Sequence, residues 1–355
     1  MTVDFPSNAR RPAPHRDLPG HGTISAIVPV FDGEAMLTRS LAPLTRFLRD
    51  GAIAELIVVD DGSTDASAAV ATSLGARVIA SGGRLGPGGA RNRGAAVARG
   101  AILWFVDADV VVHDDAADVL ASALEDEGVA AVFGTYDDAP GAPGFLSQYR
   151  NLLHRHHHVG ADPDARTFWA GCGAVRATAF AEVGGFDAAR YPRPSIEDVE
   201  LGLRLRDRGA VIRIEPRLQA KHLKAWRIAN LVRTDIVDRA MPWTRLMLER
   251  RMPAVLNTRP AERWRAGLAW LVALSLPAAM AGLVPWLAPP ALGLAALSAN
   301  AGLVARFSRA RGPGFALGAG LFHQIHYLYA SAGFVAGALA AVFAGARASR
   351  TSRRA

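Results

Sequence analysis

The stretch AILWFVDADVVV, residues 101–112, decides the fold class of this 355-residue chain. It is an apolar run that contains Asp107 and Asp109, separated by one small residue. Along an extended chain, alternate side chains point to the same side, so we expect both carboxylates on one side of a strand end. Paired carboxylates suit Mg²⁺ or Mn²⁺ and leave coordination positions for phosphate oxygens. The alternative is an acidic turn that ends a buried strand.

Strands, loops and helices alternate before this stretch. TISAIVPV (23–30), ELIVV (55–59) and residues 77–80 predict short strands, and each is followed by a loop and a helix. This alternation is typical of an α/β domain with a mainly parallel central sheet. Ligands of such sheets bind beyond the carboxyl ends of the strands, where Asp32, Asp61 and the aspartate pair all fall. We therefore expect these acidic residues to converge on one edge of the sheet.

The net charge of +8 belongs to the C-terminal region. From Arg263 onward there are nine arginines and no acidic residue, whereas the first 262 residues contain 31 basic and 32 acidic residues. Apolar sequence separates these arginines, which indicates a membrane surface and argues against a nucleic-acid partner. The only cysteine, Cys172, excludes an intramolecular disulfide framework.

Six motifs together carry a resemblance to a known family. They are VPVFDGE (28–34), VVDDGSTD (58–65), GPGGARNRG (86–94), FVDAD (105–109), GGFD (184–187) and ED (197–198). In this order and at these spacings they resemble the family 2 glycosyltransferases of the GT-A fold, over roughly residues 23–226. The resemblance implies an inverting, metal-dependent glycosyltransferase that takes its sugar from a nucleoside diphosphate.

The resemblance also implies which residues hold the donor. Asp61 corresponds to the carboxylate that accepts from a uracil ring, and Asp32 or Glu34 lies where the base and ribose are held. Carboxylates suit this task because the ring N–H and the ribose hydroxyls are donors. The alternative for these three residues is turn formation or helix capping.

Arg91 and Asn92 occupy the start of the helix that lines the donor pocket in the family. The alternative for Arg91 is a solvated surface position. The glycine-rich segment 82–94 around them does not form a P-loop pattern, because no Gly-Lys-Ser/Thr follows it.

The implied metal is Mn²⁺ or Mg²⁺. In the family the last aspartate of the D-x-D motif is the more consistent ligand, which assigns Asp109 to the metal and leaves Asp107 to contact the ribose, the metal or its water. His222 is a candidate to complete the metal shell or to contact the diphosphate, with an ordinary surface position as the alternative.

The acidic pair at 197–198 supplies the expected catalytic base. By resemblance Asp198 takes the proton of the acceptor hydroxyl, and Glu197 is its neighbour. The alternative is that both acids only favour the start of a helix, where the helix dipole attracts negative charge.

Two further segments bear on the reaction. Processive relatives carry Q-x-x-R-W near residue 226, whereas this chain has Lys224-Ala225-Trp226, which favours a single transfer over polysaccharide synthesis. The run HRHHH, residues 154–158, resembles a metal cluster, but no acidic partner stands at ligand spacing and its role stays open.

The expected organisation has five parts: a disordered lead (1–22), a GT-A domain (23–228), an amphipathic interfacial region (229–264), transmembrane segments (265–346) and a basic tail (347–355). Three uncharged segments, 266–287, 288–305 and 315–344, are expected as transmembrane helices. Within the last, His323, Gln324 and His326 are expected to face protein or headgroups, because polar groups in hydrocarbon are costly. The side of the membrane on which the C-terminus lies stays open.

The resulting hypothesis is a multi-pass protein of the inner membrane with a cytoplasmic catalytic domain. It transfers one sugar from a nucleoside-diphosphate sugar, a UDP-sugar by preference, to a lipid or lipid-linked acceptor. The alternatives are transfer to a soluble or cell-wall acceptor with the tail as anchor only, and a non-catalytic membrane scaffold or transport protein with a degenerate nucleotide-sugar domain.

Overall fold

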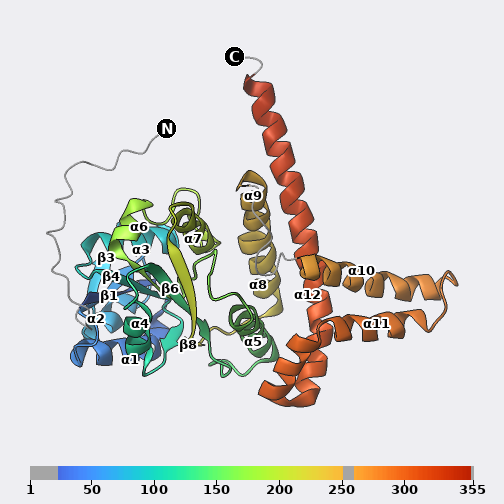
Figure 1. Ribbon diagram of the computed structural model, residues 1–355, viewed down its shortest axis with the longest axis horizontal. Coiled ribbons are helices and arrows are strands. Elements are labelled where there is room, and N and C mark those ends of the chain that lie inside the picture. The colour runs from blue at the N-terminus through green and yellow to red at the C-terminus, as the bar shows by residue number, and fades with distance from the viewer. Residues whose placement is uncertain (1–22, 251–259, 353–355) are drawn as a thin grey trace.

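A computed structural model describes residues 23–250 and 260–352, with side chains described as far as residue 343. The expected lead (1–22) and the side chains of the expected basic tail (347–355) lie outside this description. Figure 1 shows an α/β domain at the N-terminal side, beside which the C-terminal helices are arranged around one long helix.

The α/β domain alternates strands and helices. Its strands are β1 (Ile24–Val30), β2 (Glu55–Asp60), β3 (Arg77–Ala80), β4 (Ile102–Val106), β5 (Val110–Val112), β6 (Val129–Tyr136), β7 (Cys172–Arg176) and β8 (Val211–His222). Its helices are α1 (Glu34–Arg49), α2 (Ser67–Ser73), α3 (Gly86–Val97), α4 (Ala116–Ala123), α5 (Phe145–Val159), α6 (Ala177–Glu182) and α7 (Glu197–Asp207).

All eight strands form one sheet in the order β3-β2-β1-β4-β7-β6-β8-β5. The first four in this order are parallel, as the repeated strand–loop–helix units require. β7 is antiparallel to both β4 and β6, and β5 is antiparallel to β8, so the sheet is mixed and mostly parallel. The expected α/β class is confirmed, and the antiparallel insertion of β7 is an addition to it.

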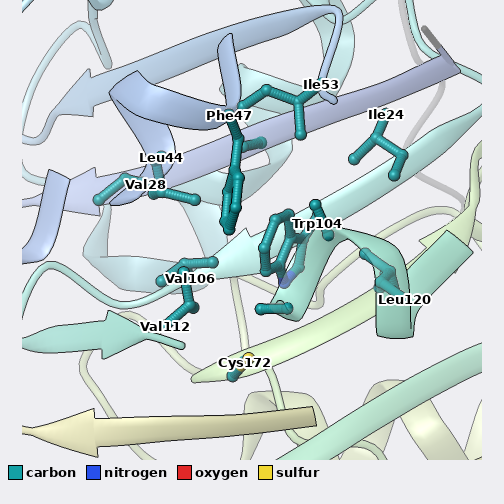
Figure 2. Close-up of a cluster of buried hydrophobic side chains, with 14 of the residues drawn as sticks. Ile24, Val28, Leu44, Phe47, Ile53, Trp104, Val106, Val112, Leu120 and Cys172 are labelled. Atoms are coloured by element: carbon teal, nitrogen blue, oxygen red, sulfur yellow. The ribbon is translucent and has the colours of Figure 1, made fainter. Parts of the chain in front are cut away.

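The sheet is buried on both faces by helices. In β1, Ile24, Ala26 and Val28 pack into one apolar cluster, whereas Ile27 points to the cluster on the opposite face. Figure 2 shows the first of these clusters, in which Trp104 of β4 is fully buried. This two-sided burial explains why the strand sequences are almost continuously apolar.

The stretch 101–112 is not one extended strand. β4 ends at Val106 and β5 begins at Val110, because the Val110 N–H donates to the carbonyl of Asp107 at 3.0 Å and closes a turn. Asp107 and Asp109 therefore stand on a turn between two strands, where simple alternation does not decide their direction.

The C-terminal region is helical. It comprises α8 (Ile228–Arg233), the π-helix η2 (Thr234–Ala240), α9 (Met241–Arg250), α10 (Pro260–Met280), α11 (Ala288–Ala299) and α12 (Ala301–Ser352), which is kinked at Gly312. In Figure 1, α9 lies along α12, and α10 with α11 forms a hairpin that projects sideways from it.

Of the three expected transmembrane helices, only the last, 315–344, falls in a helix of spanning length. Among the described residues, one helix, Ala301–Phe343 of α12, is long and apolar enough to cross a membrane. The segment 266–287 stops being helical at Met280, beyond which Gly282 has a φ of +74° and Pro285 follows. Its uncharged helical part of about 22 Å is short of a bilayer core of about 30 Å, and α11, with 12 residues, is shorter still. The described residues therefore do not support the multi-pass arrangement.

Part of helix α12 packs against helix α5 of the α/β domain. Tyr149 and Leu152 of α5 share an apolar cluster with Phe307 and Ala319 of α12. The Tyr149 hydroxyl lies 2.8 Å from Nδ1 of His323.

The polar residues of this apolar helix meet protein. Arg150 of α5 pairs with Asp235 of η2 at 2.9 Å, and Asp235 also accepts from the Tyr329 hydroxyl of α12. His323 and Gln324 are buried at this interface. The expectation that these two residues avoid lipid agrees with this packing.

Candidate active site

A cavity of about 1410 Å³ lies between the carboxyl ends of the strands and the C-terminal helices. Of the candidate residues, it is lined by Asp61, Arg91, Asp107, Asp109, Glu197, Asp198 and His222. Asp32, Glu34 and Asn92 do not line it. Seven of the ten predicted site residues are thus gathered around one space, although they come from widely separated parts of the sequence.

Asp109 and His222 face each other at this cavity. Oδ2 of Asp109 lies 3.4 Å from Nε2 of His222, the last residue of β8. The two meet because β5, directly after Asp109, pairs with the end of β8. Burial alone would raise the pKa of Asp109, but the hydrogen bond and charge of His222 hold that pKa below its ordinary value.

Arg91 occupies the centre of the acidic cluster. Its guanidinium is almost fully buried, with Nη2 2.5 Å from Asp107 Oδ1 and Nη1 3.2 Å from Glu197 Oε1. This arginine is not a solvated surface residue, because it joins the D-x-D turn to the start of α7. Burial raises the pKa of the Asp107 carboxyl, and the charge of Arg91 offsets part of that rise.

Asp198 lies in the first turn of α7, next to Glu197. Its Oδ2 accepts from the Ala170 N–H at 3.2 Å, and its Oδ1 accepts from the Val199 N–H at 2.8 Å. Burial and the adjacent Glu197 carboxylate raise the pKa of Asp198 to about 7. A carboxylate with a pKa near neutrality is suited to general base catalysis.

Asp61 organises the glycine-rich loop. Its two carboxylate oxygens accept from the N–H groups of Leu85 and Gly86, each at 2.8 Å. Gly86 has a φ of +76°, and a Cβ there would meet the carbonyl oxygen of Pro192 at 2.5 Å, so this position requires glycine. Carboxylate oxygens have further lone pairs, which leaves Asp61 able to accept from a ligand in the cavity.

Asp32 and Glu34 bind a neighbouring loop of the protein. Asp32 Oδ1 accepts from the Thr64 N–H at 2.7 Å, and Glu34 Oε2 accepts from the Ala66 N–H at 3.1 Å. Asp32 also has a φ of +47°, which an aspartate tolerates better than most residues. Both therefore fix the loop that follows β2, and direct donor contact by either stays a prediction.

Asn92 likewise binds the protein itself. Its side-chain amide donates to the Phe186 carbonyl at 2.8 Å and accepts from the Phe186 N–H at 2.9 Å. This pair of hydrogen bonds holds the GGFD segment against α3. A donor-binding role of Asn92 stays a prediction that the cavity does not support.

The histidine run of α5 forms part of the cavity wall. The ring of His154 lies 4.4 Å from that of Tyr136 and 4.7 Å from that of Trp169, and Tyr136 stacks on His222 at 4.5 Å. Burial lowers the pKa of His154 well below its ordinary value, and lowers that of His158 to about 4. These rings are neutral at pH 7 and act as aromatic surface.

The donor set fits an open divalent-cation site. Asp109 offers a carboxylate and His222 an imidazole, both lining the cavity, whereas Asp107 is held by Arg91. In the part of the chain that the structure describes, no three His, Cys, Asp or Glu side chains group closely enough to enclose an ion. Mn²⁺ and Mg²⁺ commonly bind with one or two protein ligands and complete their shell with phosphate and water oxygens, so a shared site of this kind agrees with the residues present.

The sequence reasoning missed the opposite wall. It is made by residues of η2, α9, α10 and α12, among them Arg239, Trp243, Arg263, Trp270, Phe334 and Val335. We expected the apolar segments 265–346 to face lipid, and the amphipathic region 229–264, which includes η2 and α9, to lie along the membrane surface. The histidines within the apolar run were the available signal that this helix meets protein.

The fold and the site together define the GT-A class: a mostly parallel sheet whose strand ends gather carboxylates around one cavity. Residues 25–184 match the family model described as glycosyl transferase family 2. This segment of the chain is therefore similar to the family 2 glycosyltransferases, as the motifs predicted.

Two individual proteins are similar to parts of the chain. The chain is 27% identical over 274 residues to "Uncharacterized protein MT1568" of Mycobacterium tuberculosis, covering 71% of this chain and 84% of that protein. It is 38% identical over 99 residues to a glucosyl-3-phosphoglycerate synthase of Mycolicibacterium paratuberculosis, covering 25% of this chain and 29% of that enzyme.

A solved structure shares the fold over most of the chain. This is the mannosyltransferase PcManGT from Pyrobaculum calidifontis in complex with GDP-Man and Mn²⁺. The TM-score is 0.55 at 18% identity, and the match covers 91% of this chain and 88% of that one. It shows that the GT-A fold is shared and that the match extends beyond the central sheet.

Proposed function

We propose that this protein is an inverting glycosyltransferase that moves one sugar from a nucleoside-diphosphate sugar to an acceptor at the membrane. The observation that carries the proposal is the convergence of Asp61, the Asp109–His222 pair and Asp198 on one cavity. In this proposal Asp61 binds the nucleotide, the Asp109–His222 pair binds the metal, and Asp198 accepts a proton. All three groups must lie close enough to contact the same bound substrates.

The donor lies along the strand ends. Asp61 accepts from the nucleotide base, for which a uracil N–H is the preferred partner. Asp109 and His222, with Asp107 beside them, hold Mn²⁺ or Mg²⁺, which when bound neutralises negative charge on the diphosphate. The solved mannosyltransferase of the same fold was bound to GDP-Man and Mn²⁺, so GDP is the second candidate nucleotide.

Asp198 acts as the base. It accepts the proton of the acceptor hydroxyl while that oxygen forms a bond to the anomeric carbon of the donor sugar. The bond from that carbon to the diphosphate oxygen breaks, and its electron pair leaves with the diphosphate. Attack opposite the leaving group inverts the anomeric centre, and no covalent bond to the enzyme forms.

Arg91 and Glu197 position these groups. The Arg91 guanidinium bridges Asp107 and Glu197, so it fixes the D-x-D turn relative to the helix that carries the base. We assign Arg91 and Glu197 as positioning residues. Their charged groups already bind each other and therefore hold neighbouring residues in place.

The acceptor comes from the membrane. Helix α12 includes the described segment that is long and apolar enough to enter a bilayer, and it lines the same cavity as Asp198. Anchoring raises the local concentration of lipid acceptors at the site. The Lys224-Ala225-Trp226 sequence in place of the processive Q-x-x-R-W supports transfer of a single sugar.

The test uses the full chain purified in neutral detergent. UDP- and GDP-sugars are screened with Mn²⁺ for an increase in melting temperature, because a ligand that binds only the folded state stabilises it. The stabilising donor is then incubated with membrane-lipid extract, and release of nucleoside diphosphate and formation of glycosylated lipid are measured. Sugar found only on soluble acceptors would refute the membrane acceptor, and no stabilisation by any nucleotide sugar would refute the transferase.

A further inference from the structure

Two arginines without an acidic partner line the end of the cavity that the C-terminal helices form. Arg239 of η2 and Arg263 of α10 are exposed, and neither takes part in an ion pair among the described residues. Both lie on segments that the catalytic assignments above do not use. An exposed guanidinium that lines a cavity is available to an anionic ligand.

The acidic residues at this end are already paired. Asp235 pairs with Arg150 at 2.9 Å, and Asp238 lies 3.4 Å from Arg233. Glu262 accepts from the Tyr327 hydroxyl at 2.6 Å. With these acids engaged, the charge that remains free at this end of the cavity is positive.

Apolar side chains line the same end. Trp243 of α9, Trp270 of α10, and Phe334 and Val335 of α12 all belong to the cavity wall, and Trp270, Phe334 and Val335 are exposed. Free positive charge beside exposed apolar surface matches a molecule with an anionic head and a hydrocarbon chain.

We propose that this end of the cavity is a binding site for a phosphate-bearing lipid, which is the acceptor. Arg239 and Arg263 bind the phosphate of the lipid headgroup. The hydrocarbon chain of the lipid lies against Trp270, Phe334 and Val335. The inference deepens the proposed function and rests on it, because it names the acceptor of that same site. Helix α12 is therefore a wall of the acceptor site, and removing it removes lipid recognition together with anchoring.

The experiment measures binding in the absence of turnover. Full-length protein in neutral detergent is immobilised, and retention of radiolabelled short-chain phosphatidic acid is compared with phosphatidylcholine of the same chains and with inorganic phosphate. We expect phosphatidic acid to bind more tightly than either. Arg239→Gln and Arg263→Gln each weaken its binding on the order of fivefold, the effect of one arginine near an anionic lipid.

Matched variants separate the site from general surface attraction. Arg309 of α12 is exposed and does not line the cavity, so Arg309→Gln leaves phosphatidic acid binding unchanged.

A second pair of variants tests the position of the lipid's hydrocarbon chain. Ala330 lines the cavity and Ala332 does not, so Ala330→Trp obstructs the hydrocarbon chain whereas Ala332→Trp has no effect. Equal losses in Arg309→Gln and Arg239→Gln, or equal binding of the two lipids or of inorganic phosphate, would overturn the inference.

The same samples distinguish the two proposals. Stabilisation by a nucleotide sugar with Mn²⁺ shows that each variant is folded and that its donor site is intact. Donor stabilisation without selective binding of phosphatidic acid overturns the lipid site alone. Selective lipid binding without stabilisation by any nucleotide sugar supports the lipid site and overturns the transferase assignment.

Discussion

Nη1 of Arg91 lies 3.2 Å from Oε1 of Glu197, and both side chains are almost completely buried. Because the other guanidinium nitrogen of Arg91 binds Asp107, this contact joins the D-x-D turn to the helix that carries Asp198. The proposed metal side and the proposed base side of the site are thus connected by one buried cation.

Replacing Arg91 should destabilise the protein as well as inactivate it. Arg91→Gln leaves the buried Glu197 without its counter-charge, and the partly exposed Asp107 as well. Loss of one partner of a buried ion pair costs about 3–5 kcal/mol. Arg91→Lys keeps the charge but not the two-pronged contact, so we expect a smaller loss. Urea unfolding measures both. Arg93 of the same helix is exposed, and Arg93→Gln should change stability little; equal effects at the two positions would contradict the assigned role.

The rate of sugar transfer should rise with pH through about 7. Only the deprotonated form of Asp198 accepts a proton, and its pKa is raised to about 7 by burial and by Glu197. Asp198→Asn should lower kcat by about 10²–10⁴-fold and remove this rise. Rates measured between pH 5 and 9 with saturating donor test this, and an unchanged pH profile in Asp198→Asn would refute the base assignment.

The same carboxyl predicts a pH effect on folding. Its folded-state pKa of about 7 lies above its ordinary value of 3.8, so between these values the folded protein holds a proton that the unfolded chain releases. The contribution of Asp198 to the free energy of unfolding therefore falls as the pH rises through this window. Asp198→Asn should show a smaller loss of stability from pH 4 to pH 8 than the parent protein, measured by urea unfolding at each pH.

The stabilising effect of Mn²⁺ and a nucleoside diphosphate should require the Asp109–His222 pair. His222→Ala and Asp109→Asn each remove a candidate ligand, so the increase in melting temperature on adding both should fall to near zero. His113 offers a matched control, since its Nε2 lies 3.1 Å from an Asp137 carboxylate and it does not line the cavity. A response lost equally in His113→Ala would point to a general effect on the fold.

Gly134 in β6 should not tolerate a side chain. A Cβ at this position would lie 1.9 Å from the carbonyl oxygen of Leu218 in the neighbouring strand β8, where backbone must move. Gly134→Ala should lower the free energy of unfolding by about 1–3 kcal/mol or more, as overpacking does. Gly144 has open space around it, and Gly144→Ala should be close to neutral in the same denaturant titration.

Much of the catalytic domain could be predicted from local sequence. Apolar runs such as TISAIVPV, separated by helical segments, indicated an α/β sheet, which is confirmed. The motif order indicated the family whose model matches residues 25–184. The position of Asp61, directly after β2, also followed from strand ends, because parallel strands bring their carboxyl ends to one edge.

Other site assignments depended on which partner a side chain finds. Asp32, Glu34 and Asn92 stand in matching motifs, yet their hydrogen bonds go to Thr64, Ala66 and Phe186 and not into the cavity. Asn, Asp and Glu side chains can contact a ligand or form hydrogen bonds that stabilise a turn or loop. Residue type alone does not distinguish the two roles.

The sequence by itself determined the class of domain, since strand periodicity and strand-end carboxylates are local properties of the chain. Only the tertiary structure decided that Asp109 meets His222 more than a hundred residues later, that Arg91 is buried between Asp107 and Glu197, and that α12 forms a wall of the active-site cavity. The physical reason is that an apolar helix buries equally well against lipid or protein, and a charged side chain pairs with whichever opposite charge folding brings within reach.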